Sequence, residues 1–128
     1  MTPINIILAI ILLALVGQSL WSWYSVKKAA TVIENEAFKE KMRTAQVIDV
    51  REKGDFDTAR ITGARSFPMS TLKQNAQSLR KDQPILLYDN RRQQASRAAI
   101  LLKKQGFTDI YILKNGYEGW DGRTKGAK

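Results

Sequence analysis

The sequence contains neither cysteine nor histidine in its 128 residues. Without cysteine the chain can form no disulfide and offers no thiol nucleophile, and without both residue types it holds no Cys/His metal site. A general acid or base would have to be Asp, Glu, Lys or Tyr. We therefore expect no metal and no cofactor, whereas the absence of cysteine says nothing about the cellular compartment.

The N-terminal segment has no charged side chain before Lys27. Residues 4–23 form an apolar run, and a helix of this length, rising about 1.5 Å per residue, spans about 30 Å, the thickness of a bilayer core. Trp21, Trp23 and Tyr24 gather at its end, where such side chains favour the membrane interface. These features predict a transmembrane anchor over residues 1–26, followed by a linker over 27–30.

A cleaved signal peptide is the alternative, but it would carry positive charge before the apolar run and a small-residue cleavage site after it. Here Lys27 and Lys28 follow the run, and Lys39, Lys41 and Arg43 add to the same bias. By the positive-inside rule, the N-terminus lies outside and the remaining chain lies in the cytoplasm. We therefore expect a single-pass protein of the cell membrane.

About 100 residues remain, enough for one domain, and the formal net charge of the whole chain is +9. Short apolar runs predict strands over residues 31–33, 46–50, 64–67, 85–88 and 110–113. Helical patterns lie between them, over residues 36–42, 71–79 and 94–105, with caps expected at Asn35, at Ser70 or Thr71, and at Gly106. This alternation predicts a doubly wound α/β domain over residues 31–121, with a mostly parallel five-stranded sheet and helices on both faces. The basic tail, residues 122–128, is expected to be disordered.

The chain is organised around residues 85–99. Four apolar residues after Pro84 predict a buried parallel strand. Asp89 then opens a six-residue polar loop, which leads into a helix rich in Ala, Leu and Lys. Loop amides and the helix dipole both present positive potential at such a junction. The sequence therefore predicts an anion-facing site whose first residue is itself a carboxylate.

This strand, loop and helix resemble the active-site segment of the rhodanese family, in which a strand ending in Tyr-Cys leads into a loop Cys-x-x-Gly-x-Arg. Two further motifs at family spacing carry the resemblance. One begins with Asp49-Val50-Arg51-Glu52, similar to the family's Asp-x-Arg-Glu, and continues with Asp55-Phe56, where the family has Phe. It ends with Ile61-Thr62-Gly63-Ala64, similar to His-Ile-Pro-Gly-Ala, with Arg60 for the His and Thr62 for the Pro. The other is the closing segment, residues 113–120, similar to Leu-x-Gly-Gly-x-x-x-Trp with Asn115 for the first Gly.

The resemblance covers residues 31–120 and implies a sheet with strand order 1-5-4-2-3. It also implies that Asp89 stands where the family has its nucleophilic Cys, which carries sulfur as a persulfide. Arg92 stands where a Gly is common, and Gln94 replaces the usual loop Arg. Because a carboxylate cannot carry a persulfide, we assign no catalytic residue and interpret the loop as degenerate over Asp89, Asn90, Arg91, Arg92, Gln93 and Gln94.

Two interpretations of Asp89 stay open. It is either a strand-end residue whose charge the loop amides satisfy, or a nucleophile of the kind some hydrolases use, which needs an acid or base and a stabilising cation nearby. Arg91, Arg92 and Arg97 are expected to form a basic rim around it. That rim is either a solvated surface or a docking patch for an acidic partner, anionic lipid or RNA. RNA is disfavoured because no aromatic residue is interleaved with these cations.

The remaining motif residues are interpreted as structural: Asp49, Arg51, Glu52, Gly63, Ala64, Gly116 and Trp120. We expect a membrane-anchored, catalytically inactive rhodanese-like domain that binds or scaffolds an unknown protein partner. One alternative is a sulfurtransferase or phosphatase-like enzyme that uses Asp89 or an external thiol. The other is a basic adaptor at the membrane surface or on RNA.

Overall fold

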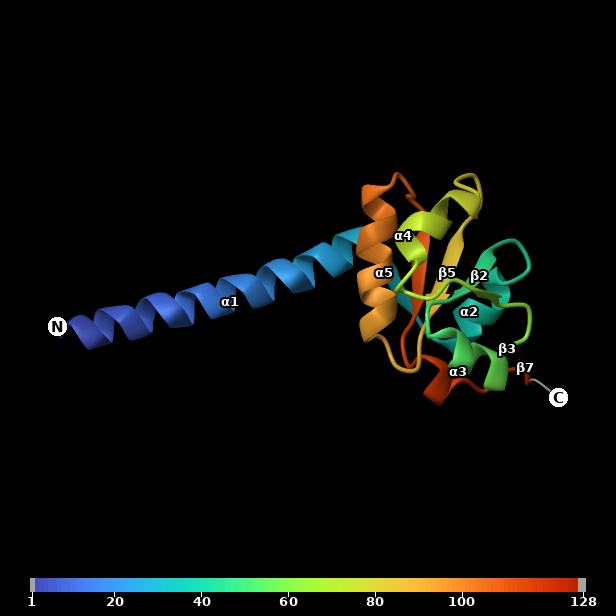
Figure 1. Ribbon diagram of the computed structural model, residues 1–128, viewed down its shortest axis with the longest axis horizontal. Helices are drawn as coiled ribbons and strands as arrows, with labels where there is room; N and C mark the ends of the chain where they lie inside the picture. Colours follow the sequence, from blue (N-terminus) through green and yellow to red (C-terminus); the bar gives the residue numbers. More distant parts are fainter. Residues whose placement is uncertain (1, 127–128) are drawn as a thin grey trace.

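The longest element is helix α1 (Pro3–Ala29), which projects away from the rest of the chain in the computed structural model (Figure 1). The structure describes residues 2–126, with the side chains of residues 22–28 excepted. Within this part of the chain, α1 is the one helix long and apolar enough to cross a membrane, by length and composition alone. Its candidate span is Pro3–Trp21, which has a mean hydropathy of 2.2 and is 0% buried in the structure.

Helix α1 runs almost directly into the first strand. Residues 27–29, predicted as part of a linker, are helical, and only Ala30 separates α1 from β1 (Thr31–Ile33). The reason is local, because no Gly or Pro interrupts residues 24–30 and alanine is the best helix former. Ala29 and Ala30 are buried in the core, so α1 joins the domain without a flexible spacer.

A five-stranded parallel sheet forms the centre of the domain. Its other strands are β2 (Gln46–Asp49), β4 (Arg65–Ser66), β5 (Ile85–Tyr88) and β6 (Ile110–Leu113). The order β1-β6-β5-β2-β4 confirms the order implied by the resemblance. Every residue of β2 and β5 is buried, and their carboxyl ends meet where Asp49 pairs with Tyr88. In parallel α/β sheets, this edge is where sites form.

Helices cover both faces of the sheet, as predicted (Figure 1). Helix α4 (Leu72–Asn75), the 3₁₀ helix η1 (Ala76–Ser78), α5 (Gln93–Lys104) and the end of α1 bury apolar side chains in the core on one face. On the other face, α2 (Asn35–Lys41) buries Phe38 among Tyr88, Trp120 and their neighbours. The closing segment contains the 3₁₀ helix η2 (Tyr117–Gly119).

Three short elements were not predicted from the sequence. Helix α3 (Lys53–Thr58) buries none of its residues, so it has no apolar periodicity to detect. Strands β3 (Arg60–Ile61) and β7 (Thr124–Lys125) pair antiparallel as a second, two-stranded sheet. The expectation of a disordered tail is therefore wrong for the described residues 122–126, because they are held by this pairing across the chain. Residues 127 and 128 lie outside the described part.

One of the predicted caps is confirmed. Gly106 ends α5 with a φ of +99°, and Phe107 N–H donates to the carbonyl of Leu102 at 3.1 Å, as in a Schellman motif. Asn35 does not cap α2, because its side-chain amide donates to the carbonyl of Gly119 at 2.8 Å instead. Thr71 precedes α4 without a capping hydrogen bond from its side chain.

Candidate functional site

Asp89 follows β5 and sits at the carboxyl edge of the sheet, directly before the loop that leads into α5. Its residue surface is only 5% exposed. One carboxylate oxygen, Oδ2, accepts a hydrogen bond from the backbone N–H of Gln94 at 2.8 Å. The other, Oδ1, is buried and accepts none from the described residues. The loop therefore provides a hydrogen bond to one of the two carboxylate oxygens.

The electrostatic environment of Asp89 is unfavourable for its charge. Burial raises the pKa of Asp89 above its ordinary value, and the hydrogen bond from the Gln94 amide only partly offsets this effect. The negative charge of Asp49 raises the pKa further. The backbone amides of Asp89 and Ala95 also act to lower this pKa, so the loop amides favour the charged form while burial opposes it.

Beneath the loop, Asp49 and Arg51 form a buried ion pair. Arg51 Nη2 lies 2.7 Å from Asp49 Oδ2, and their side chains are 5% and 0% exposed. The backbone N–H of Arg51 also donates to Asp49 Oδ1 at 2.8 Å. Arg51 Nη1 donates a hydrogen bond to the side-chain oxygen of Asn90 at 3.3 Å, and the guanidinium carbon lies 4.4 Å from the ring centroid of Tyr117. The pair thus ties the end of β2 to the Asp89 loop, which agrees with a structural role.

The closing segment holds the same loop from the other side. Tyr117 N–H donates to the carbonyl of Asp89 at 2.7 Å, and Glu118 N–H donates to that of Asn90 at 3.0 Å. Gly116 has a φ of +65°, and a Cβ there would overlap the carbonyl oxygen of Arg91. Only glycine meets both demands, the backbone conformation and the close approach. The predicted structural residue Gly116 therefore lets the closing segment lie against the loop.

A cavity of about 170 Å³ opens beside Asp89. Its lining contains three carboxylates, from Glu52, Asp55 and Asp89, and one guanidinium, from Arg51, which is already paired with Asp49. The rest of the lining comes from Val50, Asn90 and Gln94. The charge of the lining is therefore net negative, although the loop frame is one that suits anions.

The predicted basic rim does not line this cavity. Arg91 is 82% exposed at its side chain and pairs with Glu118 at 3.1 Å. Arg92 is exposed, and Arg97 lines a different hollow, together with residues of α5 itself. The reason is helical geometry: Arg97 lies a full turn inside α5, whereas the cavity reaches only the first turn, at Gln94.

Gly63 and Ala64 form the turn between β3 and β4, with a φ of +90° at Gly63 and a hydrogen bond from Ala64 N–H to the carbonyl of Ile61 at 3.0 Å. Both agree with a structural role. Trp120 packs edge-on against Phe38 with centroids 5.4 Å apart, and its indole N–H donates to the carbonyl of Arg123 at 3.2 Å.

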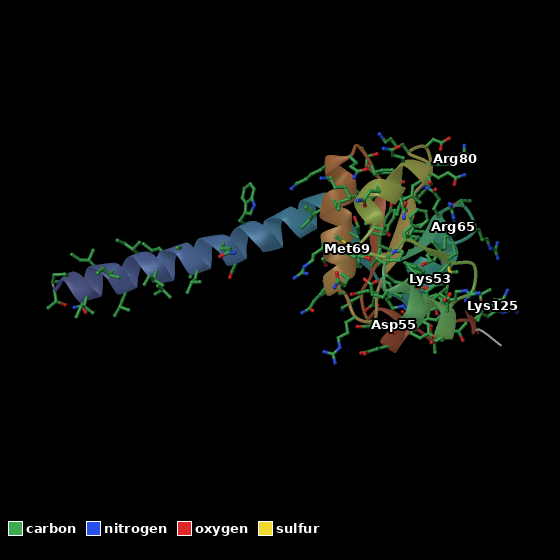
Figure 2. The ribbon with its side chains drawn as sticks, in the orientation of Figure 1. Lys53, Asp55, Arg65, Met69, Arg80 and Lys125 are labelled. Atoms are coloured by element: carbon green, nitrogen blue, oxygen red, sulfur yellow. The ribbon has the colours of Figure 1, made fainter. Side chains whose placement is uncertain are left out.

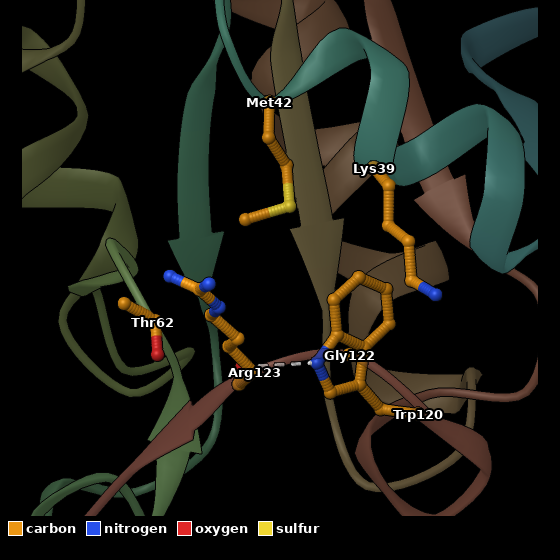
Figure 3. A pocket seen from close by; sticks show the side chains of 6 residues that line it. All are labelled: Lys39, Met42, Thr62, Trp120, Gly122 and Arg123. Atoms are coloured by element: carbon orange, nitrogen blue, oxygen red, sulfur yellow. Dashed lines mark hydrogen bonds between the residues drawn. The ribbon is translucent and has the colours of Figure 1, made fainter.

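Figure 3 shows the Trp120 ring between Lys39 and the backbone at Gly122, in a hollow of about 380 Å³. This hollow is lined by Lys39, Met42, Thr62, Trp120, Gly122 and Arg123. It contains no acid and base pair, so Asp89 and its surroundings remain the candidate site.

Few groups at this site are available for covalent chemistry. The chain has no thiol, and no group of three or more potential metal-ligating side chains occurs in the described residues. An Asp nucleophile requires a nearby cation to stabilise the electrophile, yet the one guanidinium of the lining is engaged by Asp49. The arrangement can accept hydrogen-bond donors or positive charge, and it disfavours an incoming anion.

Two contributors to the site were missed. Asp55 was noted only as part of a motif, yet it lines the cavity from α3, an element without apolar periodicity. Tyr117, which packs on Arg51 and stacks with Tyr88 at a centroid distance of 6.4 Å, was included only as a member of the closing segment. The spacing from Gly116 was the signal available for Tyr117, since the residue after a loop-contacting glycine stays close to the loop.

Comparisons with known proteins agree with this architecture. The chain is 38% identical over 124 residues to YqhL of Bacillus subtilis, an uncharacterized protein, covering 97% of this chain and 98% of YqhL. It is 26% identical over 96 residues to the thiosulfate sulfurtransferase GlpE of Tolumonas auensis, covering 75% of this chain and 84% of GlpE.

Among solved structures, the Alr3790 protein from Anabaena superposes with a TM-score of 0.69 and 27% identity, covering 74% of this chain and 92% of that one. The profile of the rhodanese-like domain family matches residues 34–123, which include four of the five strands of the sheet, the Asp89 loop and the closing segment. The chain therefore belongs to the rhodanese-like domain family.

Proposed function

We propose that this chain is a membrane-anchored rhodanese-like domain that binds a partner and does not transfer sulfur. The single observation that carries the proposal is Asp89 at the start of the loop, in a chain that has no cysteine anywhere. Sulfur transfer by a persulfide requires a thiolate that forms and releases an S–S bond. A carboxylate forms no such bond, so the family reaction has no carrier atom here.

The charge of the cavity supports the same proposal. Thiosulfate is a dianion, and an anion entering this cavity meets the carboxylates of Glu52, Asp55 and Asp89. At the low effective dielectric of a partly enclosed site, such repulsion amounts to several kcal/mol for charges about 4 Å apart. The free guanidinium that would offset it is absent from the described lining, since Arg51 is committed to Asp49.

A binding role agrees with how the loop is held. The Asp89 loop is fixed by Gln94 N–H, by Arg51 and by the closing segment, and most of its side chains face solvent. A rigid, exposed loop loses little conformational entropy when a partner binds. We propose that this loop is the contact surface for a partner protein, to be identified by crosslinking from position 90 in intact cells followed by mass spectrometry.

Membrane anchoring and orientation form the other part of the proposal. The apolar span Pro3–Trp21 precedes Lys27 and Lys28, which favours an external N-terminus and a cytoplasmic domain. Protease added to intact spheroplasts should leave the domain uncut. Digestion of the domain from outside would contradict the orientation, and recovery of the domain as a soluble fragment would contradict the anchor.

Sulfur transfer from thiosulfate to cyanide tests the central part of the proposal. Purified full-length protein in detergent should show no turnover above that of its Asp89→Ala variant. Asp89→Cys should restore a thiol but little activity, because the carboxylates of the cavity remain. Adding Arg92→Gly and Gln94→Arg should raise the rate at least tenfold over the single variant, since the loop then regains its flexible residue and its cation. Parent turnover that is lost in Asp89→Ala would support the sulfurtransferase alternative.

A further inference from the structure

The helices that share one face of the sheet with the end of α1 contain Lys and Arg but no Asp or Glu. Helix α4, η1, α5 and their flanking loops comprise residues 69–81 and 90–108, here called the basic face. These residues contain eight Lys or Arg and no Asp or Glu, and the chain's twelve carboxylates all lie elsewhere. Two cations of this face, Arg80 and Arg91, pair with carboxylates outside it. The charge of this face is therefore predominantly positive.

A hollow of about 370 Å³ lies in the basic face, between α4 and α5. Its apolar lining comes from Met69, Ile100 and Leu101. Lys73, Arg97 and Lys104 contribute cations to the lining, and Gln105 completes it. Along α5, Arg97 is followed three and four positions later by Ile100 and Leu101, and these are followed by Lys104 and, at the C-cap, Gln105, so these residues share one helical face. In the described part of the chain, none of the three cations pairs with a carboxylate.

Helix α1 brings this face close to a bilayer. Figure 1 shows α5 at the end of the domain from which α1 leaves, and α1 packs against α5. If the first 20 residues of α1 fill the hydrocarbon core, its remaining seven rise only about 10 Å further, at 1.5 Å per residue. The headgroup layer is roughly 5–8 Å thick on each side. Long Lys and Arg side chains on α5 therefore reach the level of the lipid phosphates.

We propose that the basic face binds the headgroup of an anionic phospholipid in the leaflet that faces the domain. Lys73, Arg97 and Lys104 would surround the phosphate, while the apolar lining of the hollow contacts the glycerol and the first methylenes. An apolar floor within a cationic rim is the pattern of surfaces that lie in the membrane interface. The inference rests on the proposed membrane anchor, and it fixes the height of the Asp89 cavity above the bilayer.

The absence of cysteine allows a clean test. Gln105→Cys places one polarity-sensitive fluorophore in the hollow, and Glu40→Cys places the same probe on α2, across the sheet. The labelled full-length chains are inserted into nanodiscs of phosphatidylcholine, with or without phosphatidylglycerol. Phosphatidylglycerol should shift the emission at position 105 to the blue, and high salt should reverse the shift. The probe at position 40 should not respond.

Two charge-matched variants identify the cations responsible. The rim variant carries Lys73→Gln, Arg97→Gln and Lys104→Gln. The control variant removes three cations that lie on the side of the domain away from α1 (Figure 2), by Lys53→Gln, Arg65→Gln and Lys125→Gln. The rim variant should lose roughly a hundredfold in the ratio of lipid-contacting to free domains, from the contribution of each cation near an anionic surface. The control variant should keep the shift.

An identical emission at position 105 in both kinds of disc, or an equal loss in both variants, would overturn the inference. Failure of the membrane anchor is distinguishable, because the chain would then not enter discs of either composition. Adding RNA to the phosphatidylcholine discs tests whether the basic face binds nucleic acid instead. A shift at position 105 with RNA, and none with phosphatidylglycerol, would assign the face to nucleic acid and also overturn the inference.

Discussion

Replacing Arg51 with methionine removes the cation of a buried ion pair while keeping most of its apolar stem. Asp49, which is 0% exposed, then keeps the backbone N–H at position 51 and the Tyr88 hydroxyl as donors but has no cation beside it. Leaving one partner of such a pair without the other costs about 3–5 kcal/mol. The variant also loses the guanidinium contacts to Asn90 and to the ring of Tyr117.

That loss is large on the scale of this domain. Small domains unfold with about 5–15 kcal/mol, and for a domain near 100 residues each kcal/mol shifts the melting temperature by about 4–8 °C. We therefore expect Arg51→Met to lower the melting temperature by at least about 12 °C. The double variant Asp49→Asn/Arg51→Met should be more stable than Arg51→Met alone, because it leaves no unpaired charge.

The full-length protein in detergent micelles is the sample, and near-ultraviolet circular dichroism during heating is the readout, because α1 stays helical in micelles and masks far-ultraviolet changes. Arg80→Met is the matched control, since its ion pair with Asp82 has side chains 63% and 65% exposed. An exposed pair contributes about 0–1 kcal/mol. A loss for Arg51→Met no greater than that for Arg80→Met would contradict a buried ion pair. So would a double variant that loses as much stability as the single variants Arg51→Met and Asp49→Asn lose together.

Two further predictions concern the loop and its carboxylate. Gly116→Ala should destabilise the domain by about 2 kcal/mol or more, because the new Cβ overlaps the carbonyl of Arg91 and φ is +65°. The control Gly54→Ala lies inside α3, has nothing within 4 Å of its Cβ, and should stabilise the domain by about 0.5–1 kcal/mol. Thermal melts in which both variants shift in the same direction would contradict the close approach of the closing segment. Asp89 has a raised pKa in the folded state, so its stabilising contribution is present below the ordinary value of 3.8 and is lost as the pH rises through the folded value. The stability of Asp89→Asn relative to the parent should therefore increase between pH 3 and pH 7, and urea melts that show a constant or falling difference would indicate a satisfied carboxylate.

Much of the fold could be predicted because its signals are local or repeated. Residues 31–33, 85–88 and 110–113 are β-branched or leucine-rich runs, and the structure has strands over those residues. Gly106 follows a helix of regular amphipathic pattern, and its role as a terminator needs no tertiary information. The strand order followed from the family resemblance and not from composition.

The parts that could not be predicted depend on contacts between distant residues. Strand β7 exists because Thr124 pairs with Ile61, 63 positions earlier in the chain, and a two-residue strand has no periodicity of its own. Asn35 has the right side chain for a cap, yet the carbonyl of Gly119 takes its amide. In both cases the tertiary partner, absent from the local pattern, decided the outcome.

The candidate site shows the same division. Asp89 was identified from its place after a buried strand, and it is buried there as expected. The basic rim expected around it does not line the cavity, because Arg91 pairs with Glu118 and Arg97 lines the hollow between α4 and α5. Glu52 and Asp55, more than 30 positions earlier, line the cavity because β2 and β5 are adjacent in the sheet.

The intact mass of the protein after incubation with thiosulfate shows whether this chain takes up sulfur. Unlike a turnover assay, this measurement is insensitive to a contaminating sulfurtransferase, because it detects sulfur bound to this chain alone. We expect an unmodified mass for the parent and a gain of one sulfur atom, removable by cyanide, for the variant Asp89→Cys/Arg92→Gly/Gln94→Arg. A cyanide-labile sulfur on the parent chain, located within residues 89–94, would contradict the claim that this domain does not carry sulfur.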